Sequence, residues 1–471
     1  MSDSLVKEKR VFQAGTLTYS AAGLGALFFW LLWGDFCFVL MGVVWRNVLP
    51  LQIKELAAPD WVIGLITVSI PSTLNMLLNP VISTTSDRFR SKWGRRRPFM
   101  MVATPFISFF LVILGLSPDI GRWLFDNGMG QLTGWSMGAI SAAIIAFTVL
   151  LFCTADLFVS TVFYYLFNDV VPRPVMARFL ALFRLVGTGA GVFFNFYIFP
   201  HALERMSTIF FGAAILYLVG FSLMCFFVKE GEYPPPEPLA PRKSPWPLIK
   251  AYVKECTSQK IYVLLYVHVM VWTMANVCGV FAVFSNLSLG LTMQQIGALS
   301  AVTGAMQMVL IYPAGMIADR FHPLRLLVGM EVAIVLLTPL GLVFLFTDFE
   351  PQVNYWILFA ISILNLPLGL LYQATLMPLY MRLFPREKFG QFCSFNAMCI
   401  ASMSALGGVV GGLFLSQMGK LWPASYYGEN FYYRLIPAWD LLFSGLALLL
   451  LALLYKEWLR RGAEQMEVAG K

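Results

Sequence analysis

Residues 86–98 read SDRFRSKWGRRRP, a basic loop between two apolar segments, and a shorter copy, ADRF, occupies residues 318–321. The first copy follows the second apolar segment of the chain and the other follows the eighth. A second signature repeats in the same way: VPR at 171–173 follows the fourth segment, and FPR at 384–386 follows the tenth. Two matched signatures, each six segments apart, indicate duplicated halves, and parallel repeats of this kind are typical of transporters.

The composition of the chain is that of a membrane protein. Hydrophobic residues make up 59% of the 471 residues and charged residues only 12%, whereas soluble domains average about 45–50% and about 25%. These values exclude an ordinary soluble domain, a disordered chain and a disulfide scaffold. The net charge is +8, and the basic residues flank apolar segments. We therefore interpret them as residues that set membrane topology and contact anionic lipid headgroups, and not as a nucleic-acid-binding surface.

Twelve apolar segments are long enough to span a bilayer, which takes about 20 residues each. The first is expected to be a retained helix and not a cleaved signal peptide, because it is too long and lacks a small-residue cleavage pattern. The predicted segments are 19–44, 61–84, 98–116, 137–165, 177–199, 207–228, 261–287, 293–317, 324–346, 354–377, 390–416 and 435–456.

One stretch between the sixth and seventh segments has a distinct composition. It is rich in proline, which removes backbone donors and favours extended chain. We therefore predict an N-terminal six-helix half over residues 1–230, a stiff polar cytoplasmic linker over 231–260 and a C-terminal six-helix half over 261–471.

The distribution of basic residues predicts the orientation. With both termini in the cytoplasm, 26 of the 33 Lys and Arg residues fall in cytoplasmic segments and six fall outside, among them Arg46 and Lys54; Arg184 lies within a helix. The positive-inside rule therefore favours cytoplasmic termini and an even number of spans. A multi-pass protein of the inner or plasma membrane is expected.

The basic loop also carries a family resemblance. Residues 87–98 resemble the cytoplasmic signature between helices two and three of the major facilitator superfamily. The dense RSKWGRRRP form is similar to that of the glycoside–pentoside–hexuronide cation symporters and, still more closely, of the sucrose–proton symporters; NDVVP at 168–172 is similar to their loop after helix four. The resemblance covers the whole chain in topology but only these loops in sequence. It implies an all-α major facilitator fold with 12 transmembrane helices in two pseudo-symmetric halves.

The two copies of the loop signature are candidates for a cytoplasmic gate. Carboxylates and arginines there can form contacts that one conformation makes and another breaks, and Gly94 permits a tight turn. A simple charge anchor for topology is the alternative, and both roles can hold together. Contact with substrate is not expected. The candidate gate residues are Asp87, Arg88, Gly94, Arg95, Arg96, Arg97, Asp319 and Arg320.

Four charged residues lie inside predicted spans, where a charge is costly and marks a functional candidate. Asp35, Asp156 and Arg184 lie in the first, fourth and fifth segments, and Glu331 lies two turns into the ninth. We predict that Asp156 and Arg184 pair across adjacent helices, since their heights differ by about one helical turn. Glu331 is interpreted as a gate partner or a snorkelling residue.

The resemblance gives three of these charges a role. In the glycoside symporters, acidic residues on helices one and four and an arginine on helix five line the sugar site. In the sucrose symporters, the helix-four aspartate is tied to proton coupling. Asp35, Asp156 and Arg184 match these placements, and carboxylates and guanidinium suit sugar hydroxyls. Each of these roles has a structural alternative. Asp35 could be a core carboxylate whose hydrogen bonds are satisfied within the protein, and Asp156 and Arg184 could form a purely structural ion pair.

Helix two departs from the sodium-coupled pattern that the resemblance includes. Melibiose-type members carry two aspartates there, four residues apart, and this chain has Asn75 and Asn79, followed by Pro80. Two neutral amides make a weaker cation site, so protons are favoured over Na⁺. Asp156 is the first candidate for the proton carrier and Asp35 the second. Helix–helix hydrogen bonding is the alternative for the two asparagines.

Two further polar faces are candidates for sugar contacts, because rings stack on sugars and amides meet hydroxyls. Interhelical hydrogen bonding is the alternative for both, and His268 alone is more typical of a packing residue than of a proton relay. On the seventh segment the face holds His268, Trp272 and Asn276, and on the tenth it holds Asn365, Tyr372 and Gln373.

These observations predict a secondary transporter that moves a sugar or glycoside together with protons by alternating access. Two alternatives stay open: a major facilitator carrier of drugs, pigments or other metabolites, and a non-transporting membrane sensor. The sequence has no Walker, His-Glu-x-x-His or Gly-x-Ser-x-Gly motif, and neither its histidines nor its seven cysteines have metal-ligand spacing. No enzymatic activity, cofactor, metal or nucleic-acid partner is expected, and the chain is expected to act as a monomer.

Overall fold

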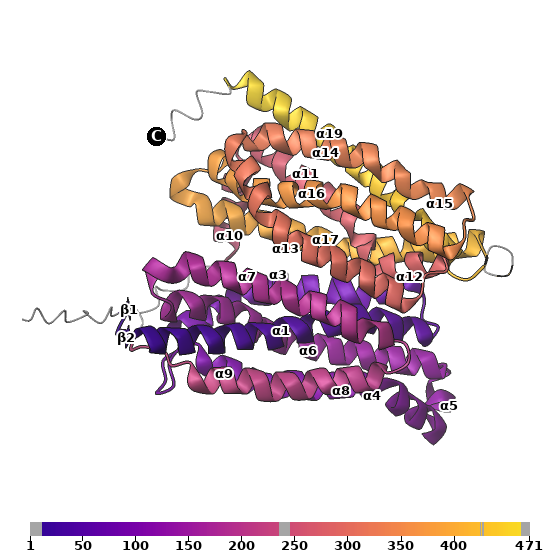
Figure 1. Cartoon of the computed structure of the whole chain (residues 1–471), viewed down its shortest axis with the longest axis horizontal. Coiled ribbons are helices and arrows are strands. Elements are labelled where there is room, and N and C mark those ends of the chain that lie inside the picture. The colour runs from indigo at the N-terminus through magenta and orange to yellow at the C-terminus, as the bar shows by residue number, and fades with distance from the viewer. Residues whose placement is uncertain (1–11, 235–244, 424, 426–427, 463–471) are drawn as a thin grey trace, which may run out of the picture. The chain divides into compact units, whose positions relative to one another are not determined.

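A computed structural model describes residues 12–234, 245–423, 425 and 428–462. Within these residues, twelve helices are long and apolar enough to cross a membrane. Figure 1 follows them along the chain from indigo to yellow. The predicted all-α fold with twelve spans is therefore confirmed.

The first six spans include several short π or 3₁₀ turns within otherwise α-helical rods. A small antiparallel hairpin, β1 (Phe12–Ala14) and β2 (Leu17–Tyr19), precedes them. The spans are α1 (Ala21–Glu55), α2–η1–α3 (Asp60–Gly64, Leu65–Ser69, Ile70–Arg88), α4–η2–α5 (Arg97–Leu124, Phe125–Met129, Gly130–Thr133), α6 (Met137–Val170), η3–α7–η4–η5 (Arg173–Val175, Met176–Phe193, Phe194–Ile198, Phe199–His201) and α8–η6–α9 (Met206–Leu216, Tyr217–Phe221, Ser222–Phe227).

The last six spans follow a short helix, α10 (Pro245–Cys256). They are α11–η7–α12 (Lys260–Asn276, Val277–Phe281, Ala282–Ser288), α13 (Met293–Arg320), α14–η8–α15 (Pro323–Leu337, Thr338–Leu342, Val343–Phe346), α16 (Pro351–Leu383), η9–α17 (Arg386–Lys388, Phe389–Leu421) and η10–α19 (Phe431–Leu435, Ile436–Arg460).

Local sequence explains where several helices begin. The Ser136 hydroxyl accepts a hydrogen bond from the backbone N–H of Ala139 and caps α6. Thr292 and Gln295 form a reciprocal capping box at the start of α13. These side chains satisfy backbone donors that the first helical turn leaves without partners.

The predicted linker is only partly extended. Residues 245–256 form α10, and the prolines at 245 and 247 lie in its first turn, where proline is tolerated because the backbone N–H has no helical partner. At the other end of α10, Glu255 is bonded to Lys388 and Gln391. The extended conformation expected from the prolines is therefore wrong for residues 245–256, whereas a stiff linker over 231–260 stays a prediction; residues 235–244 lie outside the described residues.

The chain forms two compact units. Unit 1 comprises Met1–Val48, Leu77–Phe194 and Glu204–Pro238. Its core packs α4 against α6 and α8. Aromatic rings fill the interior: Phe163 contacts Phe167 at 4.7 Å and Phe221 at 5.3 Å between centroids, and buried aromatic pairs of this kind are stabilising.

Unit 2 comprises Leu49–Met76, Asn195–Leu203 and Leu239–Lys471. Within it, α11 packs on α19, and α16 packs on both α13 and α14. The division into halves at residues 1–230 and 261–471 stays a prediction, since segments 49–76 and 195–203 cluster with unit 2.

Inside unit 2, α2 and η1 lie very close to α17. A Cβ atom built on Gly408 would lie 2.6 Å from the Gly64 carbonyl oxygen, and one on Gly412 would lie 2.5 Å from the Asp60 carbonyl oxygen. Glycine at these positions is what lets the backbones approach this closely.

A polar cluster joins the end of α1 and the start of α2 to η10 in unit 2. The Asp60 carboxylate is almost fully buried and accepts hydrogen bonds from Tyr432 at 2.9 Å and from Tyr433. Lys54 Nζ lies 3.1 Å from Asp60 Oδ1 and donates to the Tyr432 hydroxyl at 2.8 Å. Lys54 and Asp60 therefore belong to a closed network and not to a free loop.

Candidate substrate and proton site

Unit 1 holds a carboxylate without a hydrogen-bond donor. Asp35 lies on α1 and its side chain is fully buried. Neither of its carboxylate oxygens has a hydrogen-bond partner among the residues that the structure describes. A Cβ atom on Gly187 of α7 would lie 3.3 Å from Asp35 Oδ2, so a glycine allows α7 to approach the carboxylate. Asp35 is thus available to a proton or a ligand hydroxyl.

The second carboxylate, Asp156 on α6, is similarly placed. Its Oδ1 is buried and has no hydrogen-bond partner among the described residues. The cation within electrostatic range of it is Arg46 on α1. Sequence reasoning missed Arg46 because the predicted first span ended at residue 44, whereas α1 continues to Glu55.

The predicted pair between Asp156 and Arg184 is wrong. Arg184 is exposed on α7 and forms no ion pair with any described residue. Helix α6 continues to Val170, five residues beyond the predicted end. Asp156 therefore lies 14 residues from the end of its helix, and Arg184 lies 11 residues from the start of its span at Arg173, a difference of about 4.5 Å. The two heights match to within one turn, so the pair fails because the Arg184 side chain is exposed whereas Asp156 Oδ1 is buried, and the sequence does not determine this.

Tyr164 of α6 lies within electrostatic range of all four charges of this region, Asp35, Arg46, Asp156 and Arg184. Its side chain is half-exposed. We call these five residues the N-terminal charge set. It combines carboxylates that accept from hydroxyl groups, arginines that donate in a fixed fork and an aromatic ring, which are the groups that a polyhydroxylated ligand requires.

The two asparagines of the second span have different surroundings. Asn79 Oδ1 accepts a hydrogen bond from the Thr161 hydroxyl of α6 at 3.0 Å. Helix–helix hydrogen bonding of this kind is the alternative to a cation-binding role for the two asparagines. Asn75 is exposed on α3. The structure describes no group of three or more His, Cys, Asp or Glu side chains that would hold a metal ion.

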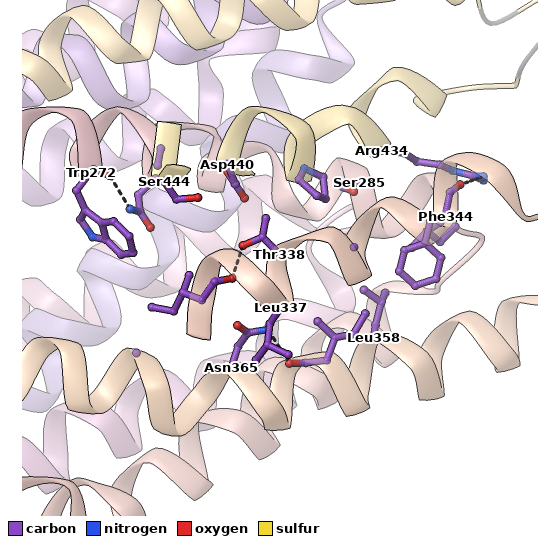
Figure 2. Close-up of a pocket in the computed structure, with 18 residues that line it drawn as sticks. Trp272, Ser285, Leu337, Thr338, Phe344, Leu358, Asn365, Arg434, Asp440 and Ser444 are labelled. Carbon is purple, nitrogen blue, oxygen red and sulfur yellow. Dashed lines mark hydrogen bonds between the residues drawn. The ribbon is translucent and has the colours of Figure 1, made fainter. Parts of the chain in front are cut away.

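Unit 2 contains a cavity of about 390 Å³. Figure 2 shows Trp272, Asp440 and Ser444 along one side of it and Asn365 and Leu358 along the other. Residues of α11, α12 and the position after it, α14, η8, α15, α16, η10 and α19 line it: Trp272, Ala275, Asn276, Ser285, Leu289, Ile334, Leu337, Thr338, Gly341, Phe344, Leu358, Ile361, Asn365, Gly369, Arg434, Pro437, Asp440 and Ser444.

Hydrogen bonding leaves this cavity rich in acceptors. Asn276 donates to the Trp272 carbonyl at 2.8 Å and Asn365 to the Ile361 carbonyl at 2.9 Å, so the amide oxygens remain. Asp440 forms no hydrogen bond or ion pair within the described part of the chain. Sequence reasoning missed Asp440, which lies only five residues into the predicted span 435–456. It could have been found by the same criterion as the other four, since it is a fifth charged residue inside a predicted span.

Of the two predicted polar faces, only part lines the cavity. Trp272, Asn276 and Asn365 do so. Tyr372 is instead buried and stacks on Trp272, with ring centroids 4.5 Å apart. Gln373 is exposed on α16.

His268 and Glu331 correct two predictions. His268 is fully buried and does not line the cavity. Its Nε2 lies 3.0 Å from Glu331 Oε1, and both side chains are 0% exposed. Glu331 is therefore neither a snorkelling residue nor a gate partner at the helix end. The sequence could not pair residues 63 positions apart on non-adjacent spans.

The cytoplasmic loop of unit 1 forms a dense ion-pair cluster. Arg95 Nη2 lies 2.6 Å from Asp169 Oδ1, and Arg96 contacts both Asp169 and Asp87. Burial alone would lower the pKa of Arg95, but the hydrogen bonds and charge of Asp169 outweigh it and raise that pKa. Gly94 has φ +102°, the left-handed conformation that its turn requires.

Glu230, which sequence reasoning missed, holds this loop to the end of the sixth span. Its carboxylate accepts hydrogen bonds from the backbone N–H groups of Arg95, Arg96 and Arg97 at 2.7–3.2 Å. Three consecutive donors at the start of α4 explain why an anion is stable there.

The shorter copy of the loop signature behaves differently. Asp319 and Arg320 are exposed at the end of α13 and form no ion pair within the described residues. Their role in a gate stays a prediction.

Twelve spans, duplicated signatures and ionisable groups buried inside apolar helices define a membrane transporter of the major facilitator class. The chain matches the family described as MFS/sugar transport protein over residues 32–456, and it belongs to that family. It is a multi-pass membrane protein.

Similar proteins agree with this assignment. The chain is 36% identical to the general alpha-glucoside permease of Schizosaccharomyces pombe over 74 residues, 16% of this chain and 12% of that protein. It is 31% identical to the sucrose transport protein SUC4 of Arabidopsis thaliana over 104 residues, 22% of this chain and 19% of that protein. The matched stretches thus span less than a fifth of these relatives. The solved nucleoside transporter NupG has the same fold, with a TM-score of 0.62, 11% identity and coverage of 91% and 98% of the two chains.

Proposed function

We propose that the protein is a secondary transporter that moves a sugar or glycoside together with protons by alternating access. The observation that carries the proposal is the pair of intramembrane carboxylates in unit 1. Asp35 is fully buried, and neither its carboxylate oxygens nor Asp156 Oδ1 has a hydrogen-bond donor among the residues that the structure describes. An ionised carboxylate in such a place is costly, so each is suited to bind a proton or a ligand hydroxyl.

Family membership and the surrounding residues support a sugar as the ligand. The relatives with matching stretches are an alpha-glucoside permease and a sucrose transport protein. The N-terminal charge set supplies acceptors, forked donors and a ring beside the two carboxylates. In unit 2, the cavity adds amide oxygens and the Trp272 face, which suit hydroxyl groups and the apolar face of a sugar.

The topology of the proposal follows the distribution of charge. We infer that both termini face the cytoplasm, that the membrane is the inner or plasma membrane, and that the working unit is a monomer. The ion-pair cluster of Arg95, Arg96 and Asp169 then lies on the cytoplasmic side and serves as a gate that opens and closes during the cycle.

Replacing the two carboxylates by amides tests the coupling. In proteoliposomes, Asp156→Asn and Asp35→Asn are expected to lower uptake of labelled sucrose or maltose driven by a pH gradient by about 10- to 100-fold, the equivalent of one charged hydrogen bond. Asp156→Asn retains sugar exchange at equal pH, because an amide imitates the protonated acid and exchange needs no net proton movement.

Asp126→Asn is the matched control, since Asp126 is an exposed aspartate beyond the end of α4. It is expected to leave uptake unchanged. Uptake that follows a Na⁺ gradient and ignores the pH gradient would overturn proton coupling. Equal uptake by all three variants would remove Asp35 and Asp156 from the proposal.

A further inference from the structure

The centre of unit 2 contains a buried ionisable pair that the proposed mechanism does not use. His268 lies on α11 and Glu331 on α14, and neither side chain is exposed. Helix α19 packs against both of these helices, and α16 packs against α14 (Figure 1). Two ionisable groups in an apolar bundle are stable only when their combined charge stays small.

Hydrogen-bond chemistry determines how many protons the pair holds. His268 Nδ1 lies 3.1 Å from the Ala447 carbonyl oxygen of α19. A carbonyl oxygen only accepts, so Nδ1 carries a proton. The remaining nitrogen, Nε2, lies 3.0 Å from Glu331 Oε1, within ion-pair distance, although the two atoms do not form a hydrogen bond of normal geometry. Two bare lone pairs at this distance would repel, so the pair holds one further proton, as imidazolium with carboxylate or as imidazole with carboxylic acid.

Both of these arrangements are electrically neutral, and within the part of the chain that the structure describes neither residue forms another ion pair. Helix α16 contributes the Tyr372 phenol, which lies within electrostatic range of Glu331. Helix α19 contributes the Ala447 carbonyl, and its Asp440 lies seven residues, or about 10 Å, away along the helix. Glu331 Oε2 is buried and has no hydrogen-bond donor among the described residues. The second carboxylate oxygen is therefore free to take another proton.

Ring contacts connect the pair to the cavity wall. Trp272 lies one turn after His268 on α11 and lines the cavity (Figure 2). Its ring stacks on Tyr372, with centroids 4.5 Å apart and planes 20° from parallel. Tyr372 in turn neighbours Glu331. A change of charge at Glu331 thus acts on the aromatic face that a ligand in the cavity meets.

We propose that His268 and Glu331 form a second proton-binding site, separate from Asp35 and Asp156, whose protonation moves Trp272 in the wall of the unit 2 cavity. Acid adds one proton from the aqueous phase to the neutral pair and gives imidazolium with carboxylic acid. That proton returns to the aqueous phase when the pair becomes neutral again. The role of this site in transport rests on the proposed function, whereas proton binding at the pair does not.

Infrared difference spectroscopy of the purified protein between about pH 5 and pH 9, the range in which histidine sites titrate, tests proton binding without any sugar. The carbonyl stretch of a protonated carboxylic acid is expected to change in amplitude with pH. The change is expected to be lost in Glu331→Gln, displaced to another pH in His268→Gln and retained in Asp35→Asn. Glu204→Gln and His201→Gln are matched controls, since both side chains are exposed.

Tryptophan fluorescence over the same pH range tests the link to the cavity. A pH-dependent change in emission is expected in the parent protein and is expected to be lost in both Trp272→Phe and Glu331→Gln. An infrared spectrum of the parent protein that is constant with pH would overturn the proposal and leave a structural pair, and this result needs no variant to fold. A titrating Glu331 with unchanged Trp272 emission would overturn the link.

Failure of the proposed function has a different signature. Absence of pH-driven uptake together with a titrating Glu331 would leave the proton site standing and remove the transport assignment. Normal pH-driven uptake together with no titration of His268 and Glu331 would leave the transport assignment standing and remove the second proton site.

Discussion

Single residues inside the helices meet the same physical problem in different ways, because a carboxylate away from water needs a cation, a proton or a ligand. Glu331 has His268 at 3.0 Å. Asp156 has the charge of Arg46 within electrostatic range. Asp35 and Asp440 have no ion-pair partner among the described residues. The residues with the fewest partners are those that we expect to meet protons and substrate.

Arg46 provides a test at this scale. Replacing it by Gln removes the positive charge within electrostatic range of Asp156, and we expect pH-driven sugar uptake to fall about tenfold, the equivalent of about 1.4 kcal/mol. Arg46→Lys is expected to retain most of the activity. Uptake into proteoliposomes measures both.

The matched control for Arg46 is Arg122→Gln, an exposed arginine at the end of α4. It is expected to transport like the parent protein. Equal losses in the Arg46 and Arg122 variants would show that the effect is one of general surface charge.

The hydropathy pattern predicts which segments form membrane-spanning helices better than it predicts where those helices begin and end. The span predicted at 293–317 is Met293–Arg320 in the structure, whereas the span predicted at 19–44 is Ala21–Glu55. Polar residues ended the first prediction, but Lys54 is bonded to Asp60 and Tyr432, and these partners are distant in sequence. A tertiary contact therefore continues a helix that composition alone ends.

The same limit explains most of what sequence reasoning missed at the candidate site. Asp35 and Asp156 could be identified as candidate site residues from sequence, because charged residues are rare inside membrane spans. Their partners could not, because a shift of one turn at a helix end moves a side chain by about 5.4 Å. The direction in which two side chains face across neighbouring helices is likewise not determined by hydropathy, and this produced the wrong Asp156–Arg184 pair. The absence of any register between distant spans hid the His268–Glu331 pair.

The glycine contacts between η1, α2 and α17 provide a test at the scale of elements. Alanine at position 408 would place a Cβ 2.5 Å from Ser69 Oγ and 2.6 Å from the Gly64 carbonyl oxygen. We expect Gly408→Ala to lower the melting temperature in detergent and to reduce uptake, because the backbones must move apart.

Gly445→Ala is the control, since a Cβ there meets no atom within 4 Å. It should be neutral or stabilising, because alanine is favoured over glycine in a helix by about 1 kcal/mol. A melting temperature of Gly408→Ala at or above that of the parent protein would contradict the close helix contact.

At the scale of the whole molecule, the duplicated signatures and the twelve spans were predictable from sequence, because both are periodic features of the chain. The two loop copies have nevertheless diverged. Glu230, Asp169 and Asp87 surround the arginines of the first copy, whereas Asp319 and Arg320 of the second form no ion pair within the described residues. Each compact unit has its own buried ionisable groups, Asp35 of the N-terminal charge set in unit 1 and the His268–Glu331 pair in unit 2.

The most direct test of the central claim is proton movement with sugar. Proteoliposomes that contain a pH-sensitive dye, with equal pH and equal Na⁺ on both sides, receive external sucrose or maltose. We predict that the lumen acidifies as the sugar enters, that a protonophore abolishes the signal and that Asp156→Asn does not produce it. Sugar entry without acidification, or entry only with Na⁺ present, would contradict proton-coupled symport.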